Sequence, residues 1–360
     1  MFIESLSLFN FRNIEHVRLK PSHLITLIHG PNGAGKTSII EAIGFLSSCR
    51  SFRSVNPSHL IRSGESGFTL QARVREQRGD TSGSSSLGVQ RLRSDDIQIS
   101  IDGRRTARVS ELADRICVQL IHPHSTDMFT EPDLRRRFID WGVYYMDPGF
   151  REYFVNYRKC LRQRNALLKN RAVGAELNVW SEQLSVLSDR INACRTAYID
   201  QLRSCLQPVL AAFLPEIRVQ MAFYPGYPEG SSLMDILTSN LNHDLQTGFT
   251  YHGCHRADLR LTVMGMAVGA VLSRGQMKLL ACALRLAQGK LLRDITGRHC
   301  IYMFDDISSE FDEHSRHLLL DNIAGLEHQV FITSIPDEIQ LPATHDSVEI
   351  QSGCVTAANG

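Results

Sequence analysis

A glycine-rich stretch near the start of the chain has the residue types and spacing of a phosphate-binding loop. Gly30, Gly35, Lys36 and Thr37 follow the pattern Gly, four residues, Gly-Lys-Thr, directly after strand-forming residues 24–28. Glycines let successive backbone N–H groups point at one anion, and the following helix adds the positive end of its dipole. We expect Lys36 to reach the β- and γ-phosphates of a nucleotide and the Thr37 hydroxyl to ligate Mg²⁺. The expected nucleotide-contacting residues are Gly30, Pro31, Asn32, Gly33, Ala34, Gly35, Lys36, Thr37 and Ser38.

The alternative for this stretch is a tight turn that caps an ordinary helix. The strand-forming residues that come before the loop make a chance match to the pattern less frequent, because a phosphate loop joins a strand to a helix. We therefore favour nucleotide binding.

Two adjacent acids follow a short apolar run in the last third of the chain. Residues 300–304, CIYMF, predict a buried strand that ends at Asp305 and Asp306. In a nucleotide site Asp305 would hold Mg²⁺, directly or through water, and Asp306 would orient the attacking water. Acid pairs after apolar runs are common, so this pair needs support from other motifs.

That support comes from residues 272–276, LSRGQ, which precede a long helix expected from Met277 to Leu292. Ser273 is a good N-cap, and Gly275 allows an anion to approach the backbone closely. The phosphate loop lies near the start and the other two motifs lie near the end, yet all must meet at one sheet. The residues between them must therefore include an insertion.

The elements that would position these motifs begin with a hairpin over residues 2–19, turning at 10–13. We expect Ile3, Ser5, Ser7 and Phe9 on one face of its first strand and Leu6 and Leu8 on the other. A helix over 36–49 follows, and strands from Phe68 and around 97–101 predict a small antiparallel sheet, with a hairpin turn at Asp102-Gly103. The composition of residues 78–86 predicts a flexible loop. Arg50 and Arg53 would contact phosphate or DNA, or lie in a solvated connector.

The insertion is predicted to be mainly helical, from about residue 120 to 213. Apolar residues alternately three and four apart from Leu177 to Tyr198 predict a helix with a heptad seam, paired with a helix over 151–171 through a turn at Gly174. The first helix of this pair carries a basic stripe that could follow a phosphate backbone; the alternative is a solvated helix face. The candidate DNA-binding residues are Arg158, Arg162 and Lys169.

Composition sets broad limits. The 360 residues suggest two domains or one head with an insertion: 1–120 and 247–360 as the two parts of the head, and 121–246 as an inserted helical lobe. Lys and Arg exceed Asp and Glu by only 39 − 38 = 1, so global charge does not argue for nucleic acid. Nine cysteines without a Cys-x-x-Cys pair indicate reduced thiols. There is no secretory start and no apolar run of about 18 residues, so we expect a cytoplasmic protein without a membrane span.

The order of the motifs, GPNGAGKTS, then LSRGQ, then FDD and SSEFD, resembles the ATP-binding-cassette superfamily. The resemblance implies an α/β head with an antiparallel β subdomain, ATP and Mg²⁺ as cofactors, and a dimer in which the signature of one subunit covers the nucleotide of the other. The signature would be Ser273, Arg274, Gly275 and Gln276, where Arg274 replaces the usual glycine. Residues 309–312 resemble the loop that crosses the dimer seam. Gln119, at the start of the insertion, could be the glutamine that senses Mg²⁺, although a glutamine at a strand end is more often structural.

Within that superfamily the chain resembles the RecF family of bacterial recombination mediators over nearly its whole length. The resemblance rests on residues 9–15, 30–43, 51–54, 135–140, 161–168, 255–259, 272–289 and 304–312. It implies a slow ATPase that dimerises on DNA at single-stranded gaps and duplex junctions, and that acts with RecR and RecO to load RecA during repair and replication restart. Cys254 departs from the usual proline before His255-Arg256, which puts the local turn in doubt.

Two other functions stay open at this point. A transporter cassette would usually have a histidine near Ser334, and would not need so basic a helical hairpin. A nucleotide-gated DNA-binding module with negligible hydrolysis is the other alternative, because Asp306 is shorter than the usual glutamate and could position water poorly.

Overall fold

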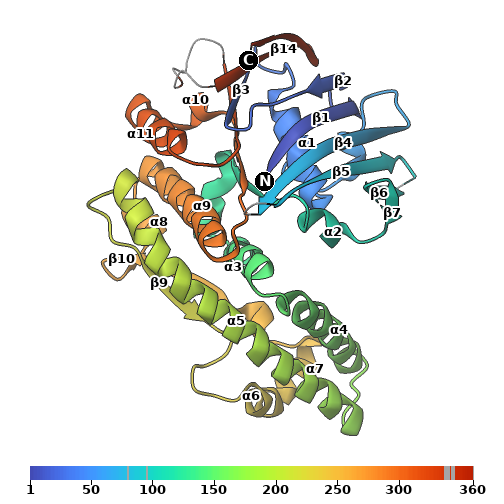
Figure 1. The fold of residues 1–360 in the computed structure, drawn as a ribbon. Coiled ribbons are helices and arrows are strands. Elements are labelled where there is room, and N and C mark those ends of the chain that lie inside the picture. Colours follow the sequence, from blue (N-terminus) through green and yellow to red (C-terminus); the bar gives the residue numbers. More distant parts are fainter. Residues whose placement is uncertain (79–80, 95, 336–340, 342–344, 360) are drawn as a thin grey trace. The chain divides into compact units, whose positions relative to one another are not determined.

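The computed structural model describes residues 1–78, 81–94, 96–335, 341 and 345–359, and the chain divides into two compact units (Figure 1). The first unit contains residues 1–125, 212–214 and 274–360, and the second contains 126–211 and 215–273. The second unit therefore extends beyond the expected lobe, 121–246. Residues up to 273 belong to it because β10 (Asp258–Val263) pairs with β9 (Gln220–Tyr224) in an antiparallel sheet that β11 (Met266–Ala267) extends.

A 6-stranded, mostly parallel sheet lies at the centre of the first unit, in the order β15-β14-β3-β13-β12-β8. Every side chain of β12 and β13 is buried, as expected for parallel strands covered on both faces. Strands β3, β13, β12 and β8 end at the same edge, where the chain continues into the predicted motifs. The strand bounds are β3 Ile25–His29, β8 Val118–Ile121, β12 Ile301–Phe304, β13 Val330–Ser334, β14 His345–Gln351 and β15 Cys354–Asn359.

Helix α1 (Lys36–Ser48) contacts strands of both sheets of the first unit and is buried almost all round. Its apolar residues include Ile39, Ile43 and Phe45, each at most 1% exposed, so hydrophobic burial fixes the helix behind the loop that precedes it. The other helical segments of this unit are η1 (Pro57–Leu60), α2 (Val109–Ala113), α9 (Arg274–Thr296), α10 (Ile307–Glu310) and α11 (Glu313–Ala324).

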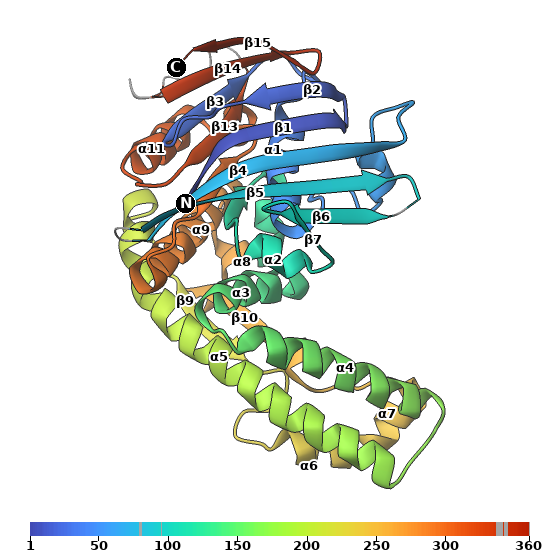
Figure 2. The same ribbon diagram turned by 45° about the vertical axis from the view of Figure 1, so that its right-hand side comes forward.

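The second sheet of the first unit is antiparallel, in the order β2-β1-β4-β5-β6-β7 (Figure 2). The expected hairpin is present as β1 (Phe2–Phe11) and β2 (Ile14–Leu19), but its faces differ from the prediction. Ile3, Leu6 and Leu8 are all buried, because the pairing register with β4 shifts between Ile3 and Ser5 and such a bulge reverses the alternation. The other strands are β4 (Gly67–Arg78), β5 (Thr81–Leu92), β6 (Ile97–Ile101) and β7 (Arg104–Thr106).

The prediction of a flexible loop over residues 78–86 is wrong for residues 81–86, which form the start of β5. Residues 79–80 lie outside the described residues. The β4–β5 ladder continues to the pair Arg78↔Thr81. Backbone pairing with a neighbouring strand overrides the weak strand preference of the serines and glycine here. The turn at Asp102-Gly103 is confirmed, with φ of 52° and 79°.

Long helices dominate the second unit. Helices α4 (Phe150–Lys169) and α5 (Ala175–Phe213) lie alongside each other, joined through Gly174, which has φ of 102° (Figure 2). The predicted heptad seam is confirmed at Leu177, Leu184 and Ile191, which are at most 2% exposed. The alternate positions of the seam are only partly buried: Trp180, Leu187 and Cys194. The remaining helical segments are η2 (Pro123–Phe129), which begins in the first unit, α3 (Pro132–Met146), α6 (Leu233–Ser239), α7 (Leu241–Thr247), η3 (Cys254–Arg256) and α8 (Val268–Val271).

Among the described residues, no helix combines the length and apolar character that crossing a bilayer requires.

Candidate nucleotide-binding site

The glycine-rich loop between β3 and α1 has the backbone geometry that a phosphate cradle needs. Gly30, Gly33 and Gly35 have φ of 153°, 78° and 116°. A Cβ on Gly30 would lie 2.0 Å from the Ile350 carbonyl oxygen, so only glycine fits at that position. The loop therefore places its N–H groups at the start of a buried helix, where they can bind an anion.

Lys36, the first residue of α1, turns its ammonium back over this loop. Its Nζ donates to the carbonyl oxygens of Gly30, at 2.6 Å, and Pro31, at 3.1 Å. Burial lowers the pKa of Lys36, and the charges of Asp306 and Asp305 oppose that effect. The loop thus holds a cation beside the N–H cradle, which fits the binding of nucleotide phosphates.

The structure brings Thr37 and Asp305 together, as the sequence predicted, from opposite ends of the chain. Thr37 Oγ1 donates to Asp305 Oδ1 at 2.9 Å. The same carboxylate oxygen accepts a hydrogen bond of 2.8 Å from Thr333 Oγ1, at the end of β13. Burial raises the pKa of Asp305, while the hydrogen bonds from the two threonines lower it. A hydroxyl and a carboxylate are ligand types that Mg²⁺ prefers, so this pair fits a magnesium site.

Asp306 lies in a left-handed backbone conformation, with φ of 55°, directly after Asp305. Its N–H donates to Thr333 Oγ1 at 2.7 Å, and its Oδ2 accepts a hydrogen bond from Ser309 Oγ, also at 2.7 Å. Thr333 therefore fixes both acids. Sequence reasoning missed Thr333, for which the only signal was a hydroxyl near the end of an apolar strand.

A cavity of about 740 Å³ opens beside the phosphate loop and has the size of a small-molecule site. It is lined by the loop, Asp306 and Thr333, and also by Arg12, Asn13 and Arg53. Of these last three residues, the sequence had suggested a phosphate contact only for Arg53.

Arg12 and Asn13 are held by the elements around α1. The Arg12 guanidinium donates to both carboxylate oxygens of Glu41, at 2.8 and 2.6 Å, and Glu41 is fully buried. Asn13 accepts from Ser38 Oγ and donates to the Gly33 carbonyl oxygen, at 2.9 Å in each case. The turn of the N-terminal hairpin thus holds the phosphate loop in place through the hydrogen bonds of Asn13.

The structure places the signature residues at the start of α9, which begins at Arg274, so Ser273 occupies the N-cap position. Arg274, Gly275 and Gln276 are not among the residues that line the cavity of their own chain. This placement is compatible with a site that receives them from a second chain.

The structure does not bring Gln119 to Thr37 and Asp305. Gln119 lies within β8, opposite Tyr302 of β12, which comes three residues before Asp305. It is fully buried, and its amide bonds to Gln288 and Arg285, each at 3.0 Å. The placement of Gln119 at the strand end was wrong, because β8 runs on to Ile121, whose carbonyl oxygen accepts from the Asp305 N–H at 2.9 Å. The residue after the strand is His122, and burial lowers its pKa to about 4.

The three residues of the predicted basic stripe on α4, Arg158, Arg162 and Lys169, are all exposed. Arg164 of the same helix is buried instead, and its guanidinium pairs with Asp244 at 2.7 Å. Not every basic residue of α4 is therefore available to a ligand.

His255 and Cys254, for which the sequence left the role open, lie within the packing of the second unit. His255 Nδ1 lies 2.6 Å from Tyr157 Oη, and Cys254 is buried with its N–H bonded to Ser188 Oγ. Burial lowers the pKa of His255 to about 4.

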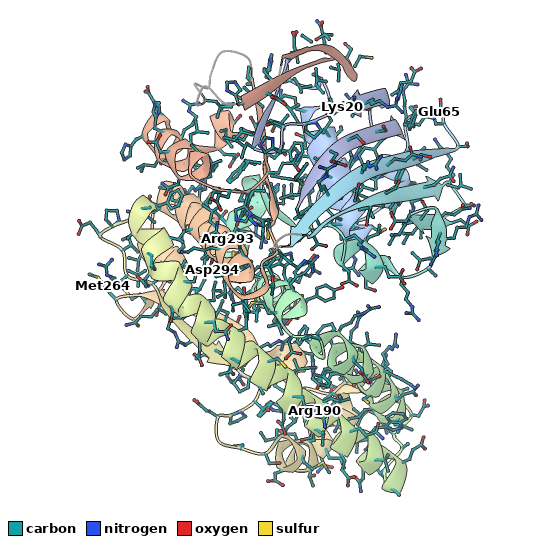
Figure 3. The ribbon with its side chains drawn as sticks, in the orientation of Figure 1. Lys20, Glu65, Arg190, Met264, Arg293 and Asp294 are labelled. Atoms are coloured by element: carbon teal, nitrogen blue, oxygen red, sulfur yellow. The ribbon has the colours of Figure 1, made fainter. Side chains whose placement is uncertain are left out.

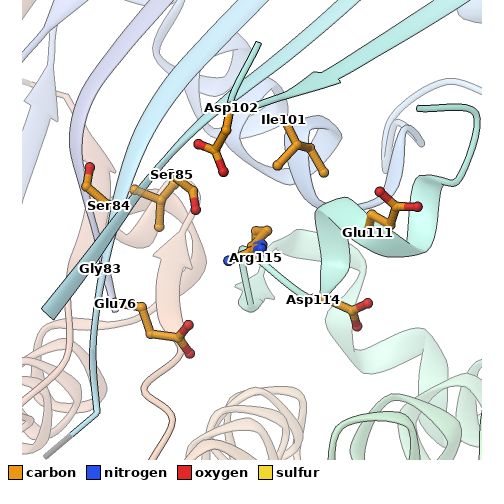
Figure 4. Close-up of a pocket in the computed structure, with 10 residues that line it drawn as sticks. Glu76, Gly83, Ser84, Ser85, Ile101, Asp102, Glu111, Asp114 and Arg115 are labelled. Carbon is orange, nitrogen blue, oxygen red and sulfur yellow. The ribbon is translucent and has the colours of Figure 1, made fainter. Parts of the chain in front are cut away.

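Another cavity, of about 630 Å³, opens between the antiparallel sheet and α2 (Figure 4). Glu76, Asp102, Glu111 and Asp114 line it together with Arg115. Its carboxylates would repel phosphate, so this cavity does not compete with the first as a nucleotide site.

Comparisons with known proteins agree with this geometry. Residues 2–353 match the family described as "RecF/RecN/SMC N terminal domain". The chain is 40% identical over 346 residues to the "DNA replication and repair protein RecF" of Shewanella sp. (strain MR-7), covering 96% of this chain and 95% of that protein. The RecF of Shewanella oneidensis is 39% identical with the same coverage.

Solved structures show the same fold. A structure of the recombination mediator RecF with ATP matches with a TM-score of 0.89 at 24% identity, covering 100% of this chain and 98% of the other. An SMC head bound to a winged-helix domain of ScpA matches with a TM-score of 0.62 at 17% identity, with the same coverage. The predicted α/β ATPase-head fold is confirmed.

Proposed function

Because the chain belongs to the RecF family of DNA replication and repair proteins, we propose that it is an ATP-dependent, DNA-binding recombination mediator. The observation that carries the proposal is the meeting of Thr37, Asp305 and Thr333 beside the phosphate loop. A solved relative is described as a RecF–ATP complex in the RecFOR pathway.

The nucleotide site would work through residues 30–38, with Lys36 neutralising the phosphates. Thr37 and Asp305 would hold Mg²⁺, whose contribution is to offset charge on the transferred phosphoryl group. Asp306 would hold the attacking water, because this residue lines the cavity and its carboxylate accepts an orienting hydrogen bond from Ser309.

The second half of the site would come from another copy of the chain. Ser273, Arg274, Gly275 and Gln276 would close over the nucleotide of the partner, and residues 309–312 would cross the seam. ATP binding would then drive homodimerisation, and slow hydrolysis would time the release of the dimer, so the ATPase would act as a conformational switch.

DNA would be the ligand of the dimer, with Arg158, Arg162 and Lys169 contacting phosphates. We place the action at single-stranded gaps and their duplex junctions in the cytoplasm, together with RecR and RecO, upstream of RecA loading. The support is family membership and the exposure of these three side chains.

A nucleotide-gated module with negligible hydrolysis is the second candidate. It is favoured by one observation: the side chain of Asp306 is one methylene shorter than that of a glutamate and reaches less far toward a water at the nucleotide. Phosphate release during a single turnover distinguishes the two, because only the ATPase produces phosphate at a rate that depends on Asp306.

The test of the proposal is DNA binding by the full chain, with and without ATP and Mg²⁺, on a gapped duplex and on an intact duplex of equal length. We expect ATP to tighten binding to the gapped duplex. Equal affinity for DNA with and without ATP would contradict the proposal.

A further inference from the structure

Each of two half-exposed aromatic rings of the second unit has a cationic side chain over one face. Phe249 and Tyr251 follow α7 and are 51% and 53% exposed. The Lys169 ammonium lies 4.6 Å from the centroid of the Phe249 ring, and the Arg256 guanidinium carbon lies 5.7 Å from that of Tyr251. Both distances are within the range of cation–π contacts. We call the group formed by Lys169, Phe249, Tyr251 and Arg256 the aromatic patch.

The backbone beneath these rings is fixed by a buried polar network. Between the rings, Thr250 is buried, and its N–H and hydroxyl bond to Asn165 Oδ1 at 2.9 and 2.7 Å. Arg164 donates to the Thr250 hydroxyl and to Asp244, each at 2.7 Å. The Tyr251 N–H also donates to Asp244, at 3.0 Å.

Arg164 and Asp244 belong to α4 and α7, which lie next to each other (Figure 2). Each side chain of this ion pair is only 1% exposed. Breaking such a pair is costly, so the segment that carries the rings is held in one position. Phe249 and Tyr251 are therefore exposed on a backbone held in one position, which lowers the entropy cost of ordering this segment on binding.

The charges around the rings select the class of ligand. His243 and His252 make ring contacts with Tyr251, at centroid distances of 5.3 and 5.0 Å, and add donors to the surface. The nearby carboxylate, Asp244, is buried against Arg164. The patch thus offers flat apolar faces and cations, which matches a ligand with flat apolar groups on an anionic backbone.

We propose that the aromatic patch is a stacking platform for the bases of single-stranded nucleic acid, with Lys169 and Arg256 beside its phosphates. This inference rests on the proposed DNA-binding function and deepens it. Bases in a duplex are already stacked on each other and paired, so the platform favours single strands over duplex. Stacking on aromatic side chains is tolerant of sequence, because every base has a π-face.

The test uses the full chain with ATP and Mg²⁺, a dT oligonucleotide of about 20 nucleotides, which exceeds the roughly 4–16 nucleotides of a typical single-strand site, and a blunt duplex of about the same length. Phe249→Leu and Tyr251→Leu keep an apolar side chain but remove the ring. We expect each to weaken oligonucleotide binding about 5- to 150-fold. Duplex affinity stays unchanged, and so does the salt dependence, because no cation is removed.

The matched control is Met264→Ala, in the turn between β10 and β11, where the methionine is 87% exposed (Figure 3). It leaves both affinities unchanged. Quenching of 2-aminopurine within the oligonucleotide gives a second readout, since the ring variants lose quenching that depends on stacking.

The platform would be overturned if both ring variants kept the oligonucleotide affinity and the quenching of the unmodified chain. An equal loss on oligonucleotide and duplex would also overturn it, because stacking does not explain duplex contact. If the unmodified chain binds neither probe, the proposed DNA-binding function itself fails.

Discussion

Thr333, in β13, donates a hydrogen bond of 2.8 Å to Asp305, the acid that also accepts from Thr37. This bond links Asp305 to the strand that neighbours β12. The Thr333 hydroxyl also accepts from the Asp306 N–H. One hydroxyl therefore orients both acids that the sequence assigned to the metal and to the attacking water.

Thr333→Val should weaken Mg²⁺-dependent nucleotide binding, because it removes this hydroxyl while keeping the shape of the side chain. Loss of a hydrogen bond to a metal ligand typically costs about 10- to 100-fold in metal affinity. Titration of Mg²⁺ at fixed ATP measures the effect, and Thr26→Val, a buried threonine of β3, is the control. Unchanged Mg²⁺ dependence would show that Thr333 has no positioning role.

Asp305→Asn should stabilise the protein in the absence of nucleotide and Mg²⁺. Burial raises the folded-state pKa of Asp305, so the carboxyl group contributes stability below its unfolded pKa and loses that contribution as pH rises through the folded value. At neutral pH the charged form therefore lowers the free energy of unfolding, and asparagine removes that cost. Thermal unfolding at neutral pH should show a higher midpoint, while Mg²⁺-dependent ATP binding is lost. A lower midpoint would contradict the assigned pKa direction.

Lys36→Ala should abolish ATP binding, because it removes the cation held over the phosphate loop by the Gly30 and Pro31 carbonyl oxygens. Equilibrium binding of a fluorescent ATP analogue measures this, with circular dichroism to show that the fold is retained. ATP affinity like that of the unmodified chain would rule out the phosphate-loop assignment.

Arg12→Ala should destabilise the first unit by at most about 3–5 kcal/mol, because it leaves the buried Glu41 carboxylate without its bidentate partner, while Ser51 and Arg53 still contact it. The double variant Arg12→Ala with Glu41→Gln should lose less, since it also removes the buried charge that has lost its bidentate partner. Denaturant unfolding of the single and double variants measures the coupling. Additive losses would show that the two side chains do not act as a pair.

Neutralising Arg158, Arg162 and Lys169 should weaken DNA binding. The slope of the logarithm of the binding constant against the logarithm of the salt concentration should become shallower by about 0.7 to 0.9 per lost phosphate contact. The contrasting variant is Arg164→Ala on the same helix, which should lower stability because Arg164 is buried with Asp244. DNA binding measured across a range of salt concentrations separates the two variants, because only the triple substitution should change the salt dependence. If the triple substitution left the salt dependence of DNA binding unchanged, the three side chains would not contact phosphates and would only face solvent.

The sequence predicted the site best where a motif is local. Residues 30–38 carry their own spacing, and an apolar run that ends in two acids places Asp305 at a strand end. Parallel strands then bring Thr37 and Asp305 together at one edge of the sheet. Thr333 and Arg12 have no such motif, because their roles come from contacts between elements far apart in the chain.

The errors have physical causes as well. Gln119 was placed at a strand end because the sequence does not mark where β8 stops, and the true end is Ile121. Residues 81–86 have the composition of a loop but pair with β4, and a register shift in β1 moves Ile3 to the face of Leu6. Strand pairing decided each of these features, and pairing is not visible in a single sequence.

The central claim is that the nucleotide site is completed by a second chain, and sedimentation velocity with and without ATP tests it most directly. The account predicts that the unmodified chain forms an ATP-dependent dimer. Ser273→Arg should bind ATP and yet stay monomeric, because the larger charged side chain blocks the signature from the partner's nucleotide; Ser273→Ala controls for loss of the N-cap. A dimer of Ser273→Arg that forms with ATP as readily as that of the unmodified chain would contradict the account.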